Sequence, residues 1–270
     1  MNFHSSSAHP GDTISGHYCT ILVGPNQQIY ASTLEGLVVR RSQSGEIESL
    51  TSGWQPGITV HRLKMYNRIL YACTNQGLFL YKNGTWTSTS IHSPCYQVRE
   101  HNGFGYAATS DGLWAGSIAD WKPAALAGLK VYDFLPLPNY IVVAHARGMS
   151  YYDRYASEWA DIYREHSVTG LTAFHNHLIG VNDLGQLVIG NKRGGLDAYG
   201  FGDLFMMGIV TRGHDVFACT DRGLFRLGFI GGSIQLLSVI QSSMVTDVDQ
   251  DHGRIYVATM FDGIQTISRQ

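Results

Sequence analysis

The chain has 270 residues and a formal net charge of −2, with 44% hydrophobic and 15% charged residues. This balance lacks the basic surface expected of a protein that binds nucleic acid or anionic membranes. No apolar run approaches the length of a membrane span, and Met1 to Pro10 shows neither the basic start nor the apolar segment of a secretion signal. The four cysteines are scattered singly, which fits a reducing compartment. We therefore expect a cytoplasmic protein with neither a membrane nor a nucleic-acid partner.

One short pattern returns along the whole chain. An apolar strand ends in Thr or a substitute, and Gly follows two to four residues later, as in Tyr30 to Leu37 and again in Tyr256 to Ile264. The repeat glycines are Gly36, Gly77, Gly112, Gly148, Gly185, Gly223 and Gly263. A period of about 40 residues with short strands and no helical pattern is typical of a β-propeller with one blade per repeat. We predict an all-β fold in which residues 1–270 form a single seven-bladed β-propeller of four-stranded antiparallel blades.

The last repeat gives the strands most clearly. Val245 and Val248 are expected in its inner strand, 254–259 in the second and 264–268 in the third. Earlier repeats add a fourth strand that often begins near Trp, but the last repeat has no residues left for one. Since an unpaired edge at the seam leaves backbone groups unsatisfied, we expect the N-terminal segment, about 3–8, to close the last blade.

The last repeat resembles a known kind of propeller repeat. Met244 to Ile264 follows the two-component-regulator pattern of Val-x-x-Ile, Asp-x-x-Gly, an aromatic, a small residue and Thr-x-x-Gly-Leu, with a looser likeness to sialidase-type repeats. This resemblance implies a seven-bladed ring. In that family the ring is usually an extracellular sensor joined to membrane and kinase parts. Such parts are not found in this sequence, so we do not expect the sensor role.

Each inner strand carries two apolar anchors, and the two residues between them are expected nearest the central axis. These pairs are Thr20-Ile21, His61-Arg62, Tyr96-Gln97, Tyr132-Asp133, Thr169-Gly170, Met207-Gly208 and Thr246-Asp247. Blades two to four thus contribute bulky polar groups, whereas blades five and six contribute small ones. An uneven ring of this kind favours a ligand-binding funnel walled on one side by hydrogen-bonding groups.

The polar residues of this ring are suited to acid–base chemistry. Histidine is a residue type suited to proton transfer near neutral pH, and a Tyr beside an Arg can act as a base because the cation stabilises its phenolate. The candidate catalytic residues are His61, Arg62, Tyr96, Tyr132 and Asp133. The candidate substrate-binding residues are Gln97, Thr169, Met207, Thr246, Asp247, Thr20 and His145, the last of which replaces the repeat Thr.

These residues allow more than one function. We expect an enzyme of the lyase, cyclase or hydrolase type that acts on a small molecule or a carbohydrate. The alternatives are a single-site or lectin-like binding protein and a protein-interaction scaffold. Arg62 can also simply form a structural ion pair with Asp133 or Asp247. No metal-ligand spacing is present, so no cofactor is expected, although a structural Ca²⁺ or similar cation on the axis remains an alternative.

Overall fold

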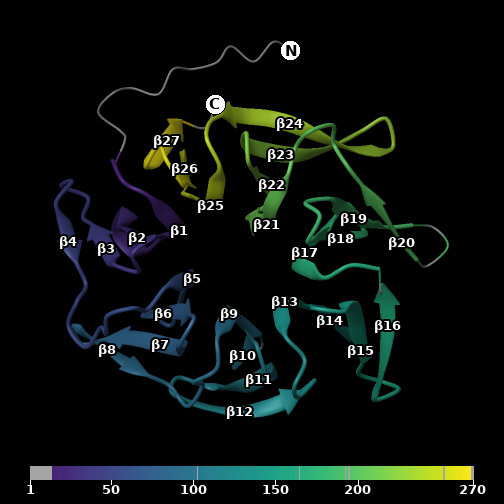
Figure 1. Ribbon diagram of the computed structural model, residues 1–270, viewed down its shortest axis with the longest axis horizontal. Helices are drawn as coiled ribbons and strands as arrows, with labels where there is room; N and C mark the ends of the chain where they lie inside the picture. Colours follow the sequence, from purple (N-terminus) through teal and green to yellow (C-terminus); the bar gives the residue numbers. More distant parts are fainter. Residues whose placement is uncertain are drawn as a thin grey trace.

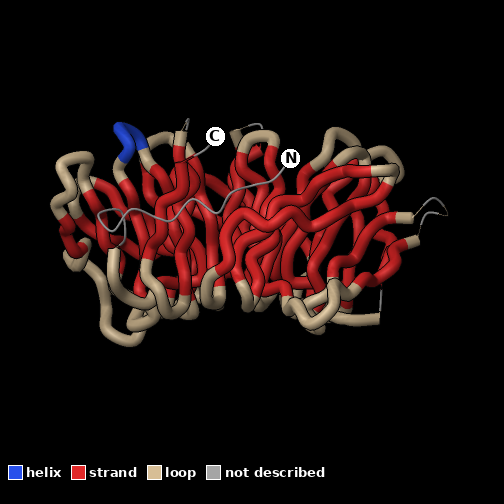
Figure 2. The backbone as a smooth tube through the Cα atoms, turned by 90° about the horizontal axis from the view of Figure 1, so that it is seen from above, coloured by secondary structure: helices blue, strands red, loops and turns tan. Residues whose placement is uncertain are grey.

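The computed structural model describes residues 14–101, 103–163, 165–191, 193, 195–251 and 253–268. They form seven antiparallel sheets, and Figure 1 shows these sheets arranged around a common centre in chain order. Seen from the side in Figure 2, the ring is a flat disc with turns and loops on both faces. The predicted seven-bladed β-propeller is confirmed. In the described part of the chain no helix is long and apolar enough to span a membrane.

Each blade starts at the axis and runs outward. The first three blades are β1 (Tyr18–Val23), β2 (Ile29–Thr33), β3 (Val38–Arg41) and β4 (Ile47–Ser49); β5 (Val60–Tyr66), β6 (Ile69–Thr74), β7 (Gly77–Lys82) and β8 (Thr85–Ser88); and β9 (Cys95–His101), β10 (Phe104–Thr109), β11 (Gly112–Ser117) and β12 (Asp120–Ala125). A single 3₁₀ turn, η1 (Pro25–Gln27), is described between β1 and β2.

The remaining blades continue the same order. They are β13 (Val131–Pro136), β14 (Tyr140–His145), β15 (Gly148–Asp153) and β16 (Glu158–Tyr163); β17 (Val168–Phe174), β18 (His177–Asn182), β19 (Leu187–Gly190) and β20 (Leu196–Tyr199); β21 (Met206–Arg212), β22 (Asp215–Thr220), β23 (Gly223–Ile230) and β24 (Ser233–Gln241); and β25 (Val245–Gln250), β26 (Arg254–Thr259) and β27 (Ile264–Ser268).

The repeated Thr-x-x-Gly turn has a direct structural cause. The Thr74 hydroxyl donates to the carbonyl of Gly77 at 2.8 Å and accepts from the backbone N–H of Gln76 at 3.1 Å. Gly77 has φ = 122°, and a Cβ there would lie 2.1 Å from the carbonyl oxygen of Ile91. The turn therefore favours a side-chain acceptor such as the Thr hydroxyl at its first position, and Gly77 must lack a side chain at its last.

Apolar packing between neighbouring blades forms the core. One buried cluster joins Tyr71 and Leu78 of the second blade to Val98 and Ala107 of the third. Another joins the first blade to the last and includes Ile21. Because each blade buries both faces against its neighbours, the anchors of the inner strands must be apolar, as predicted.

The seam between the last blade and the first is closed in part by the chain near Ile14. Its backbone N–H and carbonyl bond to the carbonyl and N–H of Ile264 at 3.1 and 2.9 Å. In the described residues the last blade has three strands, not four. The predicted fourth strand, about 3–8, lies outside the described residues.

Every inner strand begins with a β-bulge. Between the first and third residues of β5, for example, Val60 pairs with Thr74 and Arg62 pairs with Cys73, which leaves His61 outside the ladder. The bulged residues of the seven blades are Cys19, His61, Tyr96, Tyr132, Thr169, Met207 and Thr246. A bulge redirects a side chain away from the regular pleat, so it creates a distinct ring position in each blade.

Candidate functional site

The bulges correct the predicted alignment of the first blade. Its inner strand starts at Tyr18, so the pair nearest the axis is Cys19-Thr20 and not Thr20-Ile21. Ile21 is fully buried as an anchor. The prediction was wrong by one residue because the first anchor is the aromatic Tyr18, whereas the other blades begin with Val, Cys or Met.

Three predicted side chains meet in a row on one side of the ring. The rings of His61 and Tyr96 stack at 5.1 Å with an interplanar angle of 22°, and Tyr96 packs on Tyr132 at 5.3 Å. His61 Nδ1 lies 2.7 Å from the carbonyl oxygen of Cys95. Since a carbonyl only accepts, the proton of a neutral imidazole resides on Nδ1, and Nε2 is the basic nitrogen.

Lys130 completes this row. Its ammonium lies 5.2 Å from the centre of the Tyr96 ring and 4.9 Å from that of Tyr132, within the range of a cation–π interaction. Burial alone lowers the pKa of Lys130, but interactions with the two tyrosines raise it above its usual value. Lys130 precedes the fourth inner strand and was missed in the sequence, because it lies one residue before the repeat pattern begins.

The opposite side of the ring is small, as predicted. Thr169 donates to the carbonyl of Val181 at 3.3 Å, and the side chain of Met207 is 40% exposed. A Cβ added at Gly208 would meet no atom within 4 Å. The residues across the ring from the row therefore leave room beside Gly208.

Asp133, predicted as catalytic, is buried, and both of its carboxylate oxygens accept hydrogen bonds. Its carboxylate accepts from Phe134 N–H at 2.8 Å and from Leu171 N–H of the next blade at 3.0 Å. It also accepts from Arg99 at 2.9 Å and from Gln97 at 3.3 Å. Burial alone raises the pKa of Asp133, but the nearby arginines, led by Arg99, lower it below its usual value. The geometry makes Asp133 a bridge between three inner strands.

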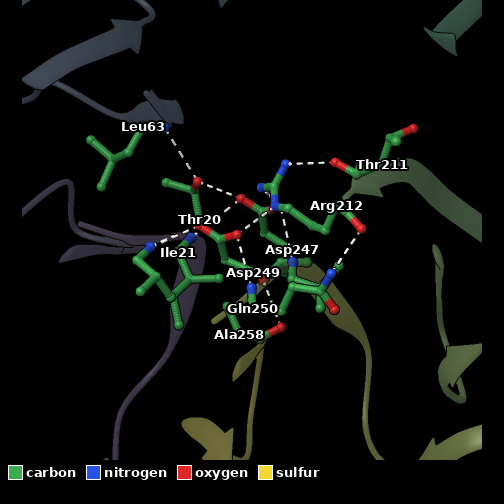
Figure 3. Close-up of polar contacts among 12 residues, drawn as sticks. Thr20, Ile21, Leu63, Thr211, Arg212, Asp247, Asp249, Gln250 and Ala258 are labelled. Carbon is green, nitrogen blue, oxygen red and sulfur yellow. Dashed lines mark hydrogen bonds and ion pairs between the residues drawn. The ribbon is translucent and has the colours of Figure 1, made fainter. Parts of the chain in front are cut away.

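Asp247 plays the corresponding part at the seam of the ring (Figure 3). It accepts from the Thr20 hydroxyl at 2.6 Å, from Ile21 N–H at 3.2 Å and from Val248 N–H at 2.9 Å. Arg212 lies 3.8 Å away. Thr246 is also held in place, because its hydroxyl donates to the carbonyl of Tyr18 at 2.8 Å and to that of Ala258 at 3.1 Å.

Four charged residues lie further along the inner strands than Asp133 and Asp247, and the sequence did not predict their part in the site. They are Lys64, Arg99, Arg212 and Asp249. Lys64, Arg99 and Asp249 each follow a predicted axial residue by two positions, and this alternation is a signal that they share its side of the strand. Arg212, at the end of β21, bonds Asp249 through Nε at 2.7 Å.

The structural ion pair that was the alternative role for Arg62 is not formed with either aspartate. Among the described residues Arg62 forms no hydrogen bond and no ion pair, and its Nε is buried. Burial alone lowers the pKa of Arg62, but the negative charges of Asp247 and Asp133 raise it above its usual value. Arg62 therefore lies in the field of both carboxylates without touching them.

His145, predicted to bind substrate, lies apart from this row on the second strand of its blade. Its Nδ1 accepts from Arg147 N–H at 3.1 Å, which is the contact the repeat Thr makes elsewhere. Its Nε2 lies 2.7 Å from the Ser150 hydroxyl, which donates to Asp161. Burial lowers the pKa of His145 below its usual value; the charge of Asp161 opposes this effect, and the charge of Arg147 adds a smaller lowering. The side chain is 3% exposed and replaces Thr as a turn cap.

Two cavities lie at the ends of the inner strands away from His61, and neither is an axial funnel. One of about 110 Å³ is lined by Tyr66, Arg99 and Trp121, between the second and third blades. The other, of about 400 Å³, lies between the first and second blades beside Tyr30 and Tyr81. No group of three His, Cys, Asp or Glu side chains suited to a metal ion occurs among the residues described here.

Comparisons with known proteins give the fold. No family model and no curated protein matches the chain. Among solved structures, the extracellular domain of a putative one-component system from B. thetaiotaomicron has a TM-score of 0.75 at 15% identity, over 96% of this chain and 40% of that one. Virginiamycin B lyase from Staphylococcus aureus has a TM-score of 0.74 at 12% identity, over 96% of this chain and 98% of that one. The chain thus spans less than half of the first structure and nearly all of the second.

Proposed function

We propose that this propeller binds a small polar or aromatic molecule over the row of His61, Tyr96 and Tyr132 and acts on it by acid–base catalysis of the lyase or cyclase type. The observation that carries the proposal is the stacked row with Lys130 against both phenol rings. It places a basic nitrogen, two hydroxyls and a cation together at one side of the ring, opposite small residues.

The chemistry follows from these groups. In an elimination, Nε2 of His61 takes a proton from a carbon of the substrate, and the C–H electron pair becomes the new double bond. The Tyr132 hydroxyl gives its proton to the leaving group, and Lys130 stabilises the phenolate that remains. Tyr96 lies between the two and holds their rings in place by its contacts with both.

Similarity to virginiamycin B lyase supports this class of reaction. That protein is a lyase matched over nearly its full length, and one of its structures is a catalytically inactive histidine-to-alanine variant with quinupristin, 13% identical to this chain. Because one fold carries many functions, the support from the row of side chains counts for more.

The test is a panel of cyclic esters, β-substituted carboxylates and p-nitrophenyl esters, followed by ultraviolet absorbance. We expect turnover of at least one class, and a loss of about 100-fold or more in kcat/KM for His61→Ala and for Tyr132→Phe. Tyr199→Phe, on the exposed outer strand β20, is the matched control and should keep full activity. Binding that depends on the row without turnover would make the site a receptor. Activity unchanged in the first two variants would rule the site out.

A further inference from the structure

The second inner strand places two basic side chains on one side of the ladder. Arg62 and Lys64 are two positions apart on β5, opposite Cys73 and Tyr71 of β6. Alternate residues of a strand share a face. Both residues are partly buried, and neither has a hydrogen bond or an ion pair to a described residue; the Nε atom of Arg62 is fully buried without a partner. A buried guanidinium nitrogen without a partner is unusual, because the desolvation of a charged group must be offset by an anion or by hydrogen-bond acceptors.

The carboxylates of the same layer are already committed. Asp133 is bonded to Arg99, and Asp249 to Arg212, which also lies 3.8 Å from Asp247. Two arginines therefore account for three carboxylates. Arg62 and Lys64 are in excess, and no described acidic group touches either of them.

Several basic groups converge on this point from different blades. Burial, followed by the charges of Arg212, Arg62 and Arg99, holds the pKa of Lys64 well below its usual range. These residues belong to the second, third and sixth blades. Four basic side chains, Arg62, Lys64, Arg99 and Arg212, thus lie near three carboxylates, and Arg62 and Lys64 have no described anion in contact.

The side of the ring that faces Arg62 leaves space. Figure 1 shows β17 and β21 across the centre from β5. The residues equivalent to Arg62 on these strands are Gly170 and Gly208. A Cβ at Gly208 would meet nothing within 4 Å, and one at Gly170 would come no closer than 3.4 Å to its nearest neighbour. The two glycines therefore add no side chain at this level on the strands across the ring from the basic pair.

We propose that Arg62 and Lys64 form a binding site for one small oxyanion, a carboxylate or a phosphate, inside the ring. A guanidinium offers a planar fork of donors to two oxygens of such an anion, and an ammonium adds a point charge. The site is separate from the row of His61 and the tyrosines, and it holds whether or not that row is catalytic.

The test is thermal unfolding and calorimetric titration of the full-length protein with sodium acetate and, separately, with inorganic phosphate. Ionic strength is kept constant with sodium chloride. We expect a saturable rise in Tm and one-to-one binding for at least one of the two anions. A response to acetate alone identifies a carboxylate site, and a response to phosphate alone identifies a phosphate site. No saturable response to either anion would overturn the proposal, because the two groups would then be satisfied by water alone.

Variants tie the binding to the two side chains. Arg62→Gln and Lys64→Met should each weaken binding by roughly tenfold or more, as expected for the loss of a charge-assisted hydrogen bond. Arg222→Gln is the matched control, since Arg222 is an exposed arginine of the sixth blade. If Arg62→Gln fails to fold, Arg62→Lys and the single Lys64 variant still decide the matter. Binding as tight in Lys64→Met as in the parent protein would overturn the assignment.

Discussion

The carboxylate of Asp247 accepts a 2.6 Å hydrogen bond from the hydroxyl of Thr20, and 227 positions separate the two residues in sequence. The same carboxylate accepts from the backbone of Ile21, and Asp249 accepts from that of Val23 at 2.7 Å. The Thr20 oxygen in turn accepts from Leu63 N–H of the second blade at 3.3 Å. The last, first and second blades are therefore linked at the axis by side chains that bond to the backbone of the next inner strand.

Removal of the Asp247 carboxylate should open this link. Asp247→Ala leaves the Thr20 hydroxyl and two buried N–H groups without an acceptor and Arg212 with one carboxylate fewer. We expect a loss of about 3–5 kcal/mol in the free energy of unfolding, measured by urea denaturation. Asp203→Asn, at an exposed side chain, should change it by no more than about 0.5 kcal/mol. Equal stability of the two variants would show that the link does not hold the ring.

Acid should weaken the same link. Burial raises the pKa of Asp247, but Arg62 and Arg212 outweigh this and lower it below its value in the unfolded chain. A group of this kind contributes stability above its unfolded pKa, and that contribution is lost as the pH falls through the folded pKa. We expect that titration of this group leaves the urea midpoint of unfolding unchanged between pH 7 and about pH 5. The midpoint should fall below about pH 4.

The variant Asp247→Asn checks this assignment, because it cannot bind the proton. Its unfolding free energy should be lower at neutral pH and should fall less steeply in acid than that of the parent protein. Asp203→Asn should keep the parent profile. If the unfolding free energy of Asp247→Asn fell with decreasing pH as steeply as that of the parent protein, other carboxylates would account for the acid sensitivity.

The repeat glycines and the hairpin glycines should respond differently to substitution. At Gly77 a Cβ would lie 2.1 Å from the carbonyl oxygen of Ile91, whereas at Gly84, with φ = 84°, it would meet nothing within 4 Å. We expect Gly77→Ala to cost about 3 kcal/mol or more, since backbone must move. Gly84→Ala should cost only about 1 kcal/mol, from its left-handed conformation. Similar losses measured by thermal or urea unfolding would contradict the role of the close carbonyl.

The periodic features of this ring are visible in the sequence, and the contacts between blades are not. The spacing of the glycines predicts the order of the blades, and the pattern around Val245 and Val248 predicts the strands β25 to β27. Both features depend on residues that are near one another in the chain, so the sequence alone indicates them. The first blade was misaligned because Tyr18 takes a place that other blades give to a small anchor. The partners of Asp133 and Asp247 depend on which side chains of neighbouring blades reach the axis, and no local pattern encodes that.

The edge of β27 leads to a prediction about the N-terminal segment. On the edge of β27 that faces away from β26, Ile14 is the only described residue that bridges to the strand, at Ile264. We expect about residues 3–8 to supply the fourth strand, so deletion of residues 2–9 should lower the Tm and expose an edge that favours self-association. Differential scanning calorimetry and analytical ultracentrifugation measure the two effects. A control in which residues 3–8 are replaced by a flexible Gly-Ser segment keeps the chain length. A truncated protein as stable and as monomeric as the parent would rule this strand out.

The bulged residue of each inner strand lies outside the ladder, and the seven blades fill it with Cys, His, Tyr, Tyr, Thr, Met and Thr. Since these positions carry no pairing partner, their identity is decoupled from the register of the sheet. Duplicated repeats can therefore diversify there while the stack of blades is conserved. A combinatorial library confined to these seven codons would explore new specificities on an unchanged scaffold.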